Sequence, residues 1–231
     1  MSKSALHGLV DIYVAPKQLF ATLPEKKGWS WLPFVLIVLV SALGVWWFYH
    51  GMSPEWIVEQ QLAMSAQEMT QAQMNESRAA LAYMADKTGI IGAASIIVIT
   101  PITLALLALY LMLVGNRGHK RPFGSWYAMA VWSNMPGIIN MLGLMVLILL
   151  SSDPNMPLTT VNYLSVNQLV LGLEPGHPWF AWFENLNLIY LWTSALVAIG
   201  LHTWSGYSAV KSTILGFLPL VLIFGIWAVF I

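Results

Sequence analysis

The chain has 231 residues, of which 58% are hydrophobic and only 9% are charged, and its formal net charge is zero. This composition excludes an ordinary water-soluble domain, in which about a quarter of the residues are charged. Ten basic residues, scattered along the chain, are too few to form a nucleic-acid groove, so we expect no nucleic-acid partner. The absence of cysteine excludes disulfides and thiolate metal sites.

Five apolar stretches are each long enough to cross a bilayer as a helix. About 20 residues, at a rise of about 1.5 Å each, span the hydrocarbon core of roughly 30 Å. None of the five stretches contains Lys, Arg, Asp or Glu. The pattern predicts an all-α, multi-pass membrane protein with one domain, residues 1–231. The predicted spans are residues 30–49, 90–114, 126–150, 186–204 and 212–231.

Residues 1–29 precede the first span and have an amphipathic pattern. Pro16 favours the start of a second short helix, which Pro24 ends. The segment either rests on the membrane surface or against the bundle, or it docks a soluble partner. Both alternatives stay open. The apolar residues that share one face of the first helix are Leu6, Leu9, Val10, Tyr13 and Val14.

A long polar segment separates the first two spans. Ser53-Pro54-Glu55 is a typical helix start, with a capping serine, a proline in the first turn and an early acid. No glycine or proline occurs from Glu55 to Thr88, and Ala, Gln, Glu and Met dominate. The segment therefore predicts one or two helices outside the membrane. Since its apolar stripe is weak, we expect it to lie in the interface rather than pack tightly.

Two spans carry prolines. Pro101 follows Thr100 in span two, where threonine hydroxyls can bond the backbone carbonyls near a kink. Pro136 is expected to kink span three and to free the carbonyl near Trp132. Two kinked neighbours could form a hinge, although static bundles have the same feature.

Span three also carries small and polar residues. Ser133, Pro136, Gly137, Asn140 and Gly143 fall near one face, and Asn134 lies on another. A face of this kind packs against neighbouring helices. The alternative is a substrate or ion pathway lined by the two asparagines.

The segment before span four contains the acid closest to any span. Glu184 is expected to be a water-facing cap that favours the helix dipole, with Asn187 beside it. The alternative is that the Glu184 carboxylate binds an ion and couples its movement to transport. Between two turn signals, residues 161–173 could form a short helix or an extended segment.

The charges predict an orientation. Segments 1–29, 115–125 and 205–211 hold eight of the ten basic residues, including Lys3 and Arg117. Segments 50–89 and 151–185 hold eight of the ten acidic residues, including Glu68. Since basic residues in short loops stay cytoplasmic, the rule places the N-terminus inside and the C-terminus outside. The first apolar run lacks a small-residue cleavage pattern and is expected to remain as an anchor.

The sequence contains none of the usual catalytic motifs. There is no nucleophile elbow, no phosphate-binding loop and no pair of carboxylates within a span, and the five histidines lack zinc-ligand spacing. We therefore expect a protein that is not an enzyme and that uses neither a metal nor another cofactor.

Several short motifs resemble those of one family. Asp11-Ile12-Tyr13-Val14-Ala15-Pro16 is similar to a motif that precedes the first span of eukaryotic Yip1 domain proteins, with one extra residue and with Ala15 replacing a glycine. The order of elements resembles the bacterial members of the Yip1 domain family. Further resemblances are Pro16 with Phe20 before span one, Phe123-Gly124-Ser125-Trp126 through Asn134-Met135-Pro136 in span three, and Gly200-Leu201-His202 through Gly206-Tyr207 and Lys211 before span five.

The resemblance implies an integral membrane protein without known catalytic chemistry. The first hypothesis is an adaptor or organiser in the bacterial inner membrane, with membrane lipids, a membrane-protein partner or a second copy of the chain as partners. The alternative is a transporter or lipid-handling subunit that uses the polar face of span three. Five spans without an inverted repeat disfavour a lone transporter.

The orientation predicts the outcome of a reporter fusion. Alkaline phosphatase joined after Ile231 should be active in a bacterial host, because the fifth span delivers the C-terminus to the periplasm. A reporter joined in the loop after residue 116 serves as the control and should be inactive. The opposite pattern would overturn the predicted orientation.

Overall fold

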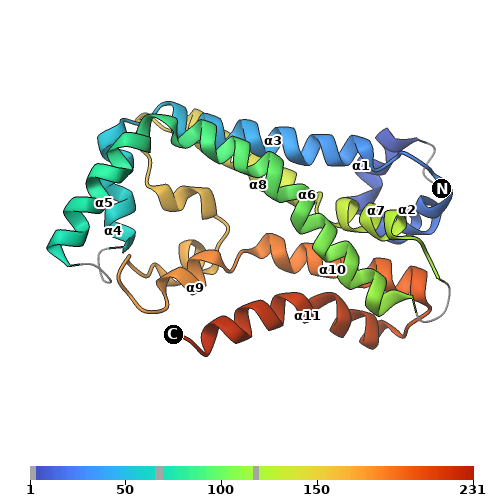
Figure 1. The fold of residues 1–231 in the computed structure, drawn as a ribbon. Coiled ribbons are helices and arrows are strands. Elements are labelled where there is room, and N and C mark those ends of the chain that lie inside the picture. Colours follow the sequence, from blue (N-terminus) through green and yellow to red (C-terminus); the bar gives the residue numbers. More distant parts are fainter. Residues whose placement is uncertain (1–3, 66–69, 117–119) are drawn as a thin grey trace.

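The computed structural model describes residues 4–65, 70–116 and 120–231; Lys3, Glu68 and Arg117 lie outside these ranges. Five apolar helical runs in the described chain are long enough to cross a membrane, which confirms the prediction of a multi-pass all-α protein. The two termini lie at opposite ends of the bundle (Figure 1), as five crossings require. The crossing helices are α3 (Trp31–His50), α6 (Thr88–Gly115), α7 (Phe123–Ser133) with α8 (Pro136–Leu150), α10 (Leu188–Ser205) and α11 (Ala209–Ala228).

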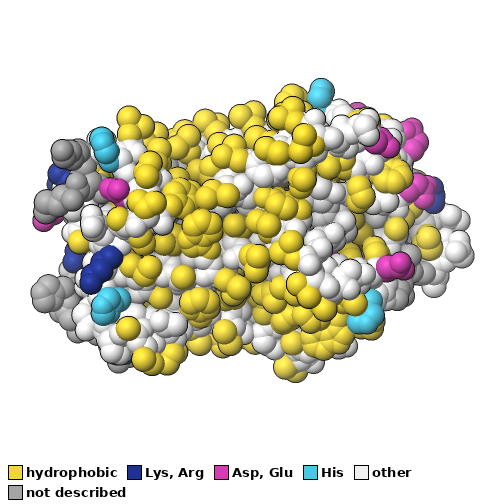
Figure 2. Space-filling view, turned by 180° about the vertical axis from the view of Figure 1, so that it is seen from behind, with side chains coloured by type: hydrophobic (Ala, Val, Ile, Leu, Met, Phe, Trp, Pro, Cys, Tyr) yellow, Lys and Arg dark blue, Asp and Glu magenta, His cyan; other side chains and the backbone are white. Residues whose placement is uncertain are grey.

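The outside of the bundle is apolar, as lipid contact requires. Leu106, Leu113 and Leu149 are 61%, 68% and 68% exposed, although they lie within crossing helices. Figure 2 shows a wide hydrophobic belt, with most Lys and Arg side chains at one end and most Asp and Glu side chains at the other. We call these the basic end and the acidic end. The described basic residues of the basic end are Lys17, Lys26, Lys27, Lys120, Arg121 and Lys211.

The N-terminal segment forms a helical hairpin that packs into the bundle. It comprises α1 (Ala5–Val14), α2 (Pro16–Thr22) and the 3-10 turn η1 (Leu23–Glu25). Ile12, Leu19 and Phe20 are completely buried, whereas Leu6, Val10 and Val14 are exposed. The predicted apolar face of the first helix is split, because its Leu9 and Tyr13 pack against the core while its other three residues are exposed. A helix that is apolar on both sides suits a position between the bundle and lipid.

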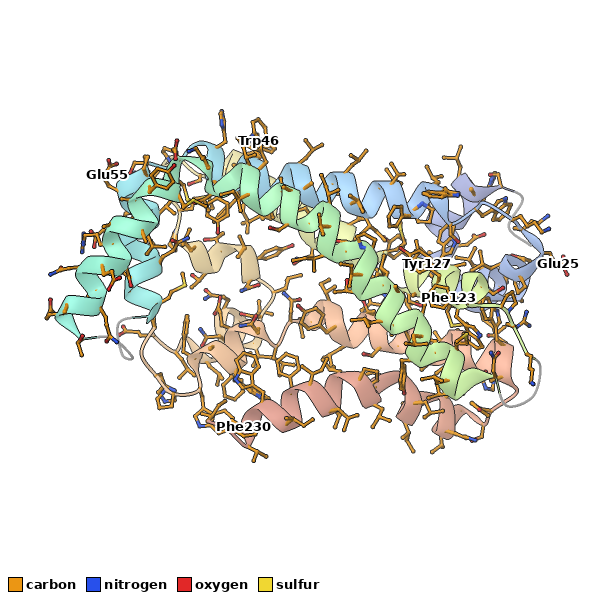
Figure 3. The ribbon with its side chains drawn as sticks, in the orientation of Figure 1. Glu25, Trp46, Glu55, Phe123, Tyr127 and Phe230 are labelled. Atoms are coloured by element: carbon orange, nitrogen blue, oxygen red, sulfur yellow. The ribbon has the colours of Figure 1, made fainter. Side chains whose placement is uncertain are left out.

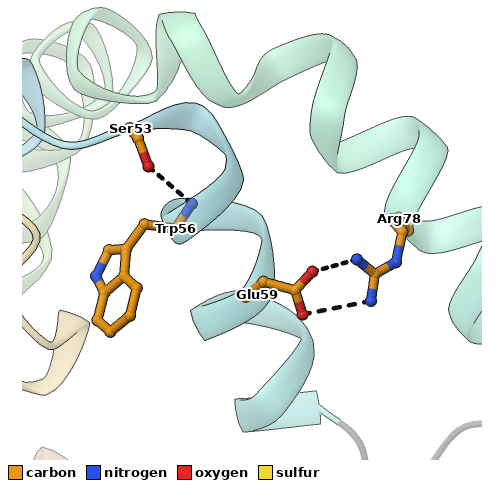
Figure 4. A network of polar contacts seen from close by, with 4 residues as sticks. All are labelled: Ser53, Trp56, Glu59 and Arg78. Carbon is orange, nitrogen blue, oxygen red and sulfur yellow. Dashed lines mark hydrogen bonds and ion pairs between the residues drawn. The ribbon is translucent and has the colours of Figure 1, made fainter.

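The segment after α3 forms a second helical hairpin at the acidic end, composed of α4 (Pro54–Ser65), α5 (Gln71–Met84) and η3 (Ala85–Lys87). The Trp56 backbone N–H donates to the Ser53 hydroxyl at 3.2 Å, which confirms the predicted helix start. Arg78 forms a two-pronged ion pair with Glu59 across the hairpin (Figure 4). Because both side chains are about half exposed, this pair contributes little stability.

The expectation that this second hairpin packs loosely is wrong for α4. Ile57, Val58 and Leu62 are buried, and Ile57 joins a small core with Phe48 of α3 and Leu144 of α8. The weak stripe on α4 is sufficient because it meets apolar side chains of the crossing helices. By contrast, α5 buries no residue, as its polar composition predicts.

The loop between spans three and four contains several short helical turns. Of the two alternatives for residues 161–173, a short helix or an extended segment, the structure therefore has the helical one. The loop contains the 3-10 turn η4 (Leu158–Asn162), the π-helical turn η5 (Asn167–Leu171) and α9 (Phe180–Asn185). One isolated antiparallel bridge, from Ser165 to Asn187, joins this loop to the start of α10.

Helices α10 and α11 make a close contact at Gly216. A Cβ atom at this position would lie 2.8 Å from the Ala198 backbone nitrogen and 2.8 Å from the Ser194 carbonyl oxygen. These are backbone atoms, so neither can move aside without shifting α10. Membrane helices commonly approach through small residues in this way, because dispersion contacts rather than the hydrophobic effect hold them together.

Replacing Gly216 by valine should therefore separate α11 from α10. We expect a loss of about 1–3 kcal/mol, the usual range for overpacking, and a lower thermal midpoint in detergent measured by size-exclusion chromatography. The matched control is Gly225→Val on the same helix, where no atom lies within 4 Å of an added Cβ. An equal loss of stability in the two variants would show that the loss comes from the helix propensity of valine and not from the contact at Gly216.

Candidate functional site

Span three is interrupted halfway along its length. Helix α7 ends at Ser133 and α8 begins at Pro136, which has no backbone N–H to donate. The Trp132 carbonyl accepts from the Met135 N–H at 3.3 Å instead. The predicted kink at Pro136 is confirmed, and it is a break between two helices rather than a bend.

The Asn134 side chain serves this break. Its Nδ2 donates to the Ala130 carbonyl at 2.8 Å, four residues back on its own helix. The same carbonyl also accepts from the Asn134 backbone N–H at 3.2 Å, so the side chain adds a second hydrogen bond at the end of α7. This contact supports the packing interpretation of Asn134 over the pathway interpretation.

The N-terminal hairpin reaches the same break. The Tyr13 hydroxyl donates to the Met135 carbonyl at 2.8 Å, and the Tyr13 ring meets the edge of Trp192 with ring centres 5.7 Å apart. Burial raises the pKa of Tyr13 to about 12, so the hydroxyl stays protonated at neutral pH. Asp11 is half-buried at the end of α1, and Pro16 begins α2. These family-motif positions shape and anchor the hairpin.

Asn140 lies on α8, about one helical turn after Pro136 in the direction of the acidic end. Its backbone carbonyl accepts from the Tyr163 hydroxyl at 3.1 Å, while its side-chain Oδ1 is buried without a partner among the described residues. The neighbouring Gly143 also faces Tyr163, since a Cβ there would clash with the phenol. The polar face of α8 thus receives the loop after span three. Asn134 and Asn140 line neither of two cavities in the described part of the chain, one of about 660 Å³ and one of about 360 Å³.

Pro101 does not interrupt its helix. Helix α6 continues through it from Thr88 to Gly115, and the Thr103 hydroxyl donates to the Thr100 carbonyl at 2.9 Å. The predicted threonine–carbonyl bond near the proline is confirmed. The two prolines therefore differ in their effect on the backbone: Pro136 separates two helices, whereas Pro101 lies within one continuous helix.

Glu184 is not the water-facing cap that its position suggests. Its side chain is 5% exposed, and its Oε2 accepts from Asn167 Nδ2 and from Gln168 Nε2, each at 2.9 Å. Its other oxygen, Oε1, is buried without a partner in the described part of the chain. Asn187 is the actual cap, because its side chain accepts from the Ile189 N–H at 2.9 Å. The prediction failed because η5, which supplies both donors, folds back over α9, and sequence spacing does not reveal this contact.

Gly206 and Tyr207 end α10 and tie it to α6. Gly206 has a φ of +66°, the left-handed conformation in which glycine ends helices. The Tyr207 hydroxyl donates to the Val114 carbonyl at 2.6 Å, near the end of α6. His202 Nδ1 lies 2.7 Å from the Tyr207 carbonyl. Both motif residues therefore have structural contacts at the basic end.

A cavity of about 660 Å³ lies at the basic end, between η1, the start of α3, the start of α7 and the end of α10. We call it the basic pocket. Figure 3 shows Phe123 and Tyr127 on α7 at this end, with Glu25 projecting away from the protein. Four basic residues contribute to its lining, and four aromatic residues form much of its apolar wall. These are Lys26, Lys27, Lys120 and Arg121, with Trp31, Phe34, Tyr127 and Trp204.

The pattern that marks the basic pocket is visible in the sequence. Two segments, 26–31 and 120–127, each place two basic residues a few positions before aromatic residues at the start of a span. The pairing of these segments could not be derived from the sequence, because it depends on how α3 and α7 pack. A second, mainly apolar cavity of about 360 Å³ lies among α6, α10 and α11.

The described residues contain no group of three or more His, Asp or Glu side chains placed to hold a metal ion. A family profile described as the Yip1 domain matches residues 10–231, nearly the whole chain. The chain belongs to the Yip1 domain family. No curated protein and no solved structure matches it. The matched residues begin within α1 and include all five crossing helices.

The hydrogen bond from Tyr13 to the Met135 carbonyl should stabilise the folded protein. Tyr13→Phe keeps the ring but removes the donor, so we expect a loss of about 1 kcal/mol, the net value of a typical buried hydrogen bond. Thermal unfolding in detergent measures the change. The matched control is Tyr83→Phe, since Tyr83 is 75% exposed on α5. Equal midpoints for the two variants would contradict a role for this hydroxyl at the break.

Proposed function

We propose that this member of the Yip1 domain family is a non-enzymatic adaptor or organiser of the bacterial inner membrane, with its basic end in the cytoplasm. Its partners are membrane lipids or a membrane protein, and a second copy of the chain is included among the candidates. The observation that carries the proposal is the basic pocket, where Lys27, Lys120 and Arg121 meet an aromatic wall. A surface of this kind binds an anionic or amphipathic partner without chemistry at a reactive group.

The burial of span three argues for this function over transport. Trp132 and Ser133 are fully buried, and Asn134 bonds its own helix. Residues that line a transport pathway need contact with water or substrate. The Asn140 backbone carbonyl instead accepts from the Tyr163 hydroxyl, which holds the loop after span three against α8.

Variants at the two locations separate the functions. We would purify tagged chains from the native membrane in mild detergent and quantify by mass spectrometry what accompanies each. The wild type should retain a stoichiometric partner, and Lys27→Gln with Lys120→Gln should lose it. Asn134→Leu should retain it, provided that the variant elutes as folded protein.

The opposite result identifies the alternative. If Asn134→Leu loses the bound molecule while the basic-end variant keeps it, the adaptor proposal fails and a pathway along span three gains support. Deleting residues 1–23 would not be a clean test, because Leu19 and Phe20 are fully buried in the bundle and their loss would unfold it.

A further inference from the structure

The basic pocket lies where the polar and apolar parts of the protein surface meet. Helix α3 begins at Trp31 and α7 begins at Phe123, and both helices then continue as membrane-crossing runs. The lining includes Lys26 and Lys27 before the first of these starts, and Lys120 and Arg121 before the second. The cavity therefore spans the boundary between water and the hydrocarbon core.

Arg121 is held in place at the rim of the pocket. Its guanidinium lies over the Trp204 ring, 4.8 Å from the ring centre, and its backbone N–H donates to Asn116 Oδ1 at 2.8 Å. The same Asn116 oxygen accepts from Trp126 Nε1 at 3.1 Å. The Arg121 Nε atom is buried and has no hydrogen-bond partner among the described residues, whereas the residue as a whole is partly exposed and lines the pocket. Its guanidinium is the side chain best suited to bind phosphate.

The start of α7 adds to the attraction for an anion. Pro122 precedes the helix and supplies no side-chain cap, and the Ser125 N–H donates to the Pro122 carbonyl at 3.0 Å. The first-turn N–H groups left for an anion are those of Phe123 and Gly124, and Gly124 lines the pocket. An added Cβ at Gly124 would meet no atom within 4 Å, so this wall borders open space.

The remaining wall is apolar and opens to the side of the bundle. Trp31 is 66% exposed, and Phe34 and Tyr127 lie farther along α3 and α7 with ring centres 6.3 Å apart. Leu23 and Pro24 of η1 complete this wall. A soluble anion would gain no free energy from this apolar surface, whereas the glycerol and upper acyl chain of a phospholipid would remove it from water.

We propose that the basic pocket binds one anionic phospholipid of the surrounding leaflet, with its phosphate between Arg121, Lys27 and Lys120 and its chains along Trp31 and Phe34. The cavity of about 660 Å³ is too large for an inorganic anion and within the range of small-molecule sites, which suits the head group and glycerol of one phospholipid. Basic pockets between membrane helices recognise lipid head groups by the same combination. This inference rests on the proposed function, because it names what the basic end binds.

The test uses delipidated protein in detergent and native mass spectrometry. The probes are phosphatidylglycerol and phosphatidylcholine with identical acyl chains. Wild-type protein should retain one phosphatidylglycerol in preference to phosphatidylcholine. Lys27→Gln with Lys120→Gln should weaken phosphatidylglycerol binding roughly 30-fold, since each basic residue near a lipid surface contributes a factor of about five.

A steric variant tests the cavity rather than the charge. Gly124→Leu places a side chain in the open space at the wall and should weaken the binding of both lipids. The charge control is Lys17→Gln with Lys211→Gln, which removes two charges from the same end without touching the pocket lining. This control should leave the preference for phosphatidylglycerol within about a factor of two, because screened charges outside the pocket act weakly.

Three results would overturn the inference. The first is equal binding of the two lipids, the second is an equal loss in the charge control, and the third is displacement of bound phosphatidylglycerol by millimolar inorganic phosphate. If any of these occurs while copurification still depends on the basic end, the lipid assignment fails and the adaptor proposal stands. If the lipid binds as expected while copurification is independent of the basic end, the adaptor proposal fails and the lipid site stands.

Discussion

The need to satisfy backbone polar groups inside lipid governs the arrangement of this protein. The break before Pro136 lies within span three, where water cannot replace a missing donor. The Met135 N–H meets that need by donating to the Trp132 carbonyl. The Asn134 side chain and the Tyr13 hydroxyl add second hydrogen bonds to the Ala130 and Met135 carbonyls beside the break. The Tyr13 bond comes from outside span three and ties the N-terminal hairpin to the break.

The position of the hairpin in turn shapes the basic end. From Tyr13 the chain turns at Pro16 and returns along α10, where the Phe20 carbonyl accepts from Trp204 Nε1 at 2.7 Å. The next residues, Leu23 and Pro24, then form one wall of the basic pocket, and Trp204 forms another. One short segment therefore connects the break in the middle of the bundle to the cavity at its end.

Much of the fold could be predicted because its causes are local. A span needs only a run of apolar residues, and the start of α4 needs only a serine, a proline and an acid in order, so both were predicted correctly. Pro136 breaks its helix through its own missing N–H, and this too is visible in the sequence.

The predictions that were wrong concern features that depend on contacts between residues far apart in the sequence. The burial of Glu184 depends on Asn167 and Gln168, which are 17 and 16 residues away, and the tight packing of α4 depends on partners in α3 and α8. The basic pocket joins two segments almost a hundred residues apart. Helical periodicity reports which residues share a face, but it does not report which distant face that surface meets.

The charged side chains at the two ends of the bundle have different surroundings. At the acidic end, amide donors from η5 bond one oxygen of Glu184, and the carboxylate is almost completely removed from water. At the basic end, Leu23 and Pro24 of the N-terminal hairpin border a cavity that has Lys26, Lys27, Lys120 and Arg121 in its lining. Charged side chains beside an apolar wall have a low free energy only where water or an external ion reaches them, and the anionic head groups of the adjoining leaflet are such ions. The basic end therefore has the open, charged surface that the proposed binding requires.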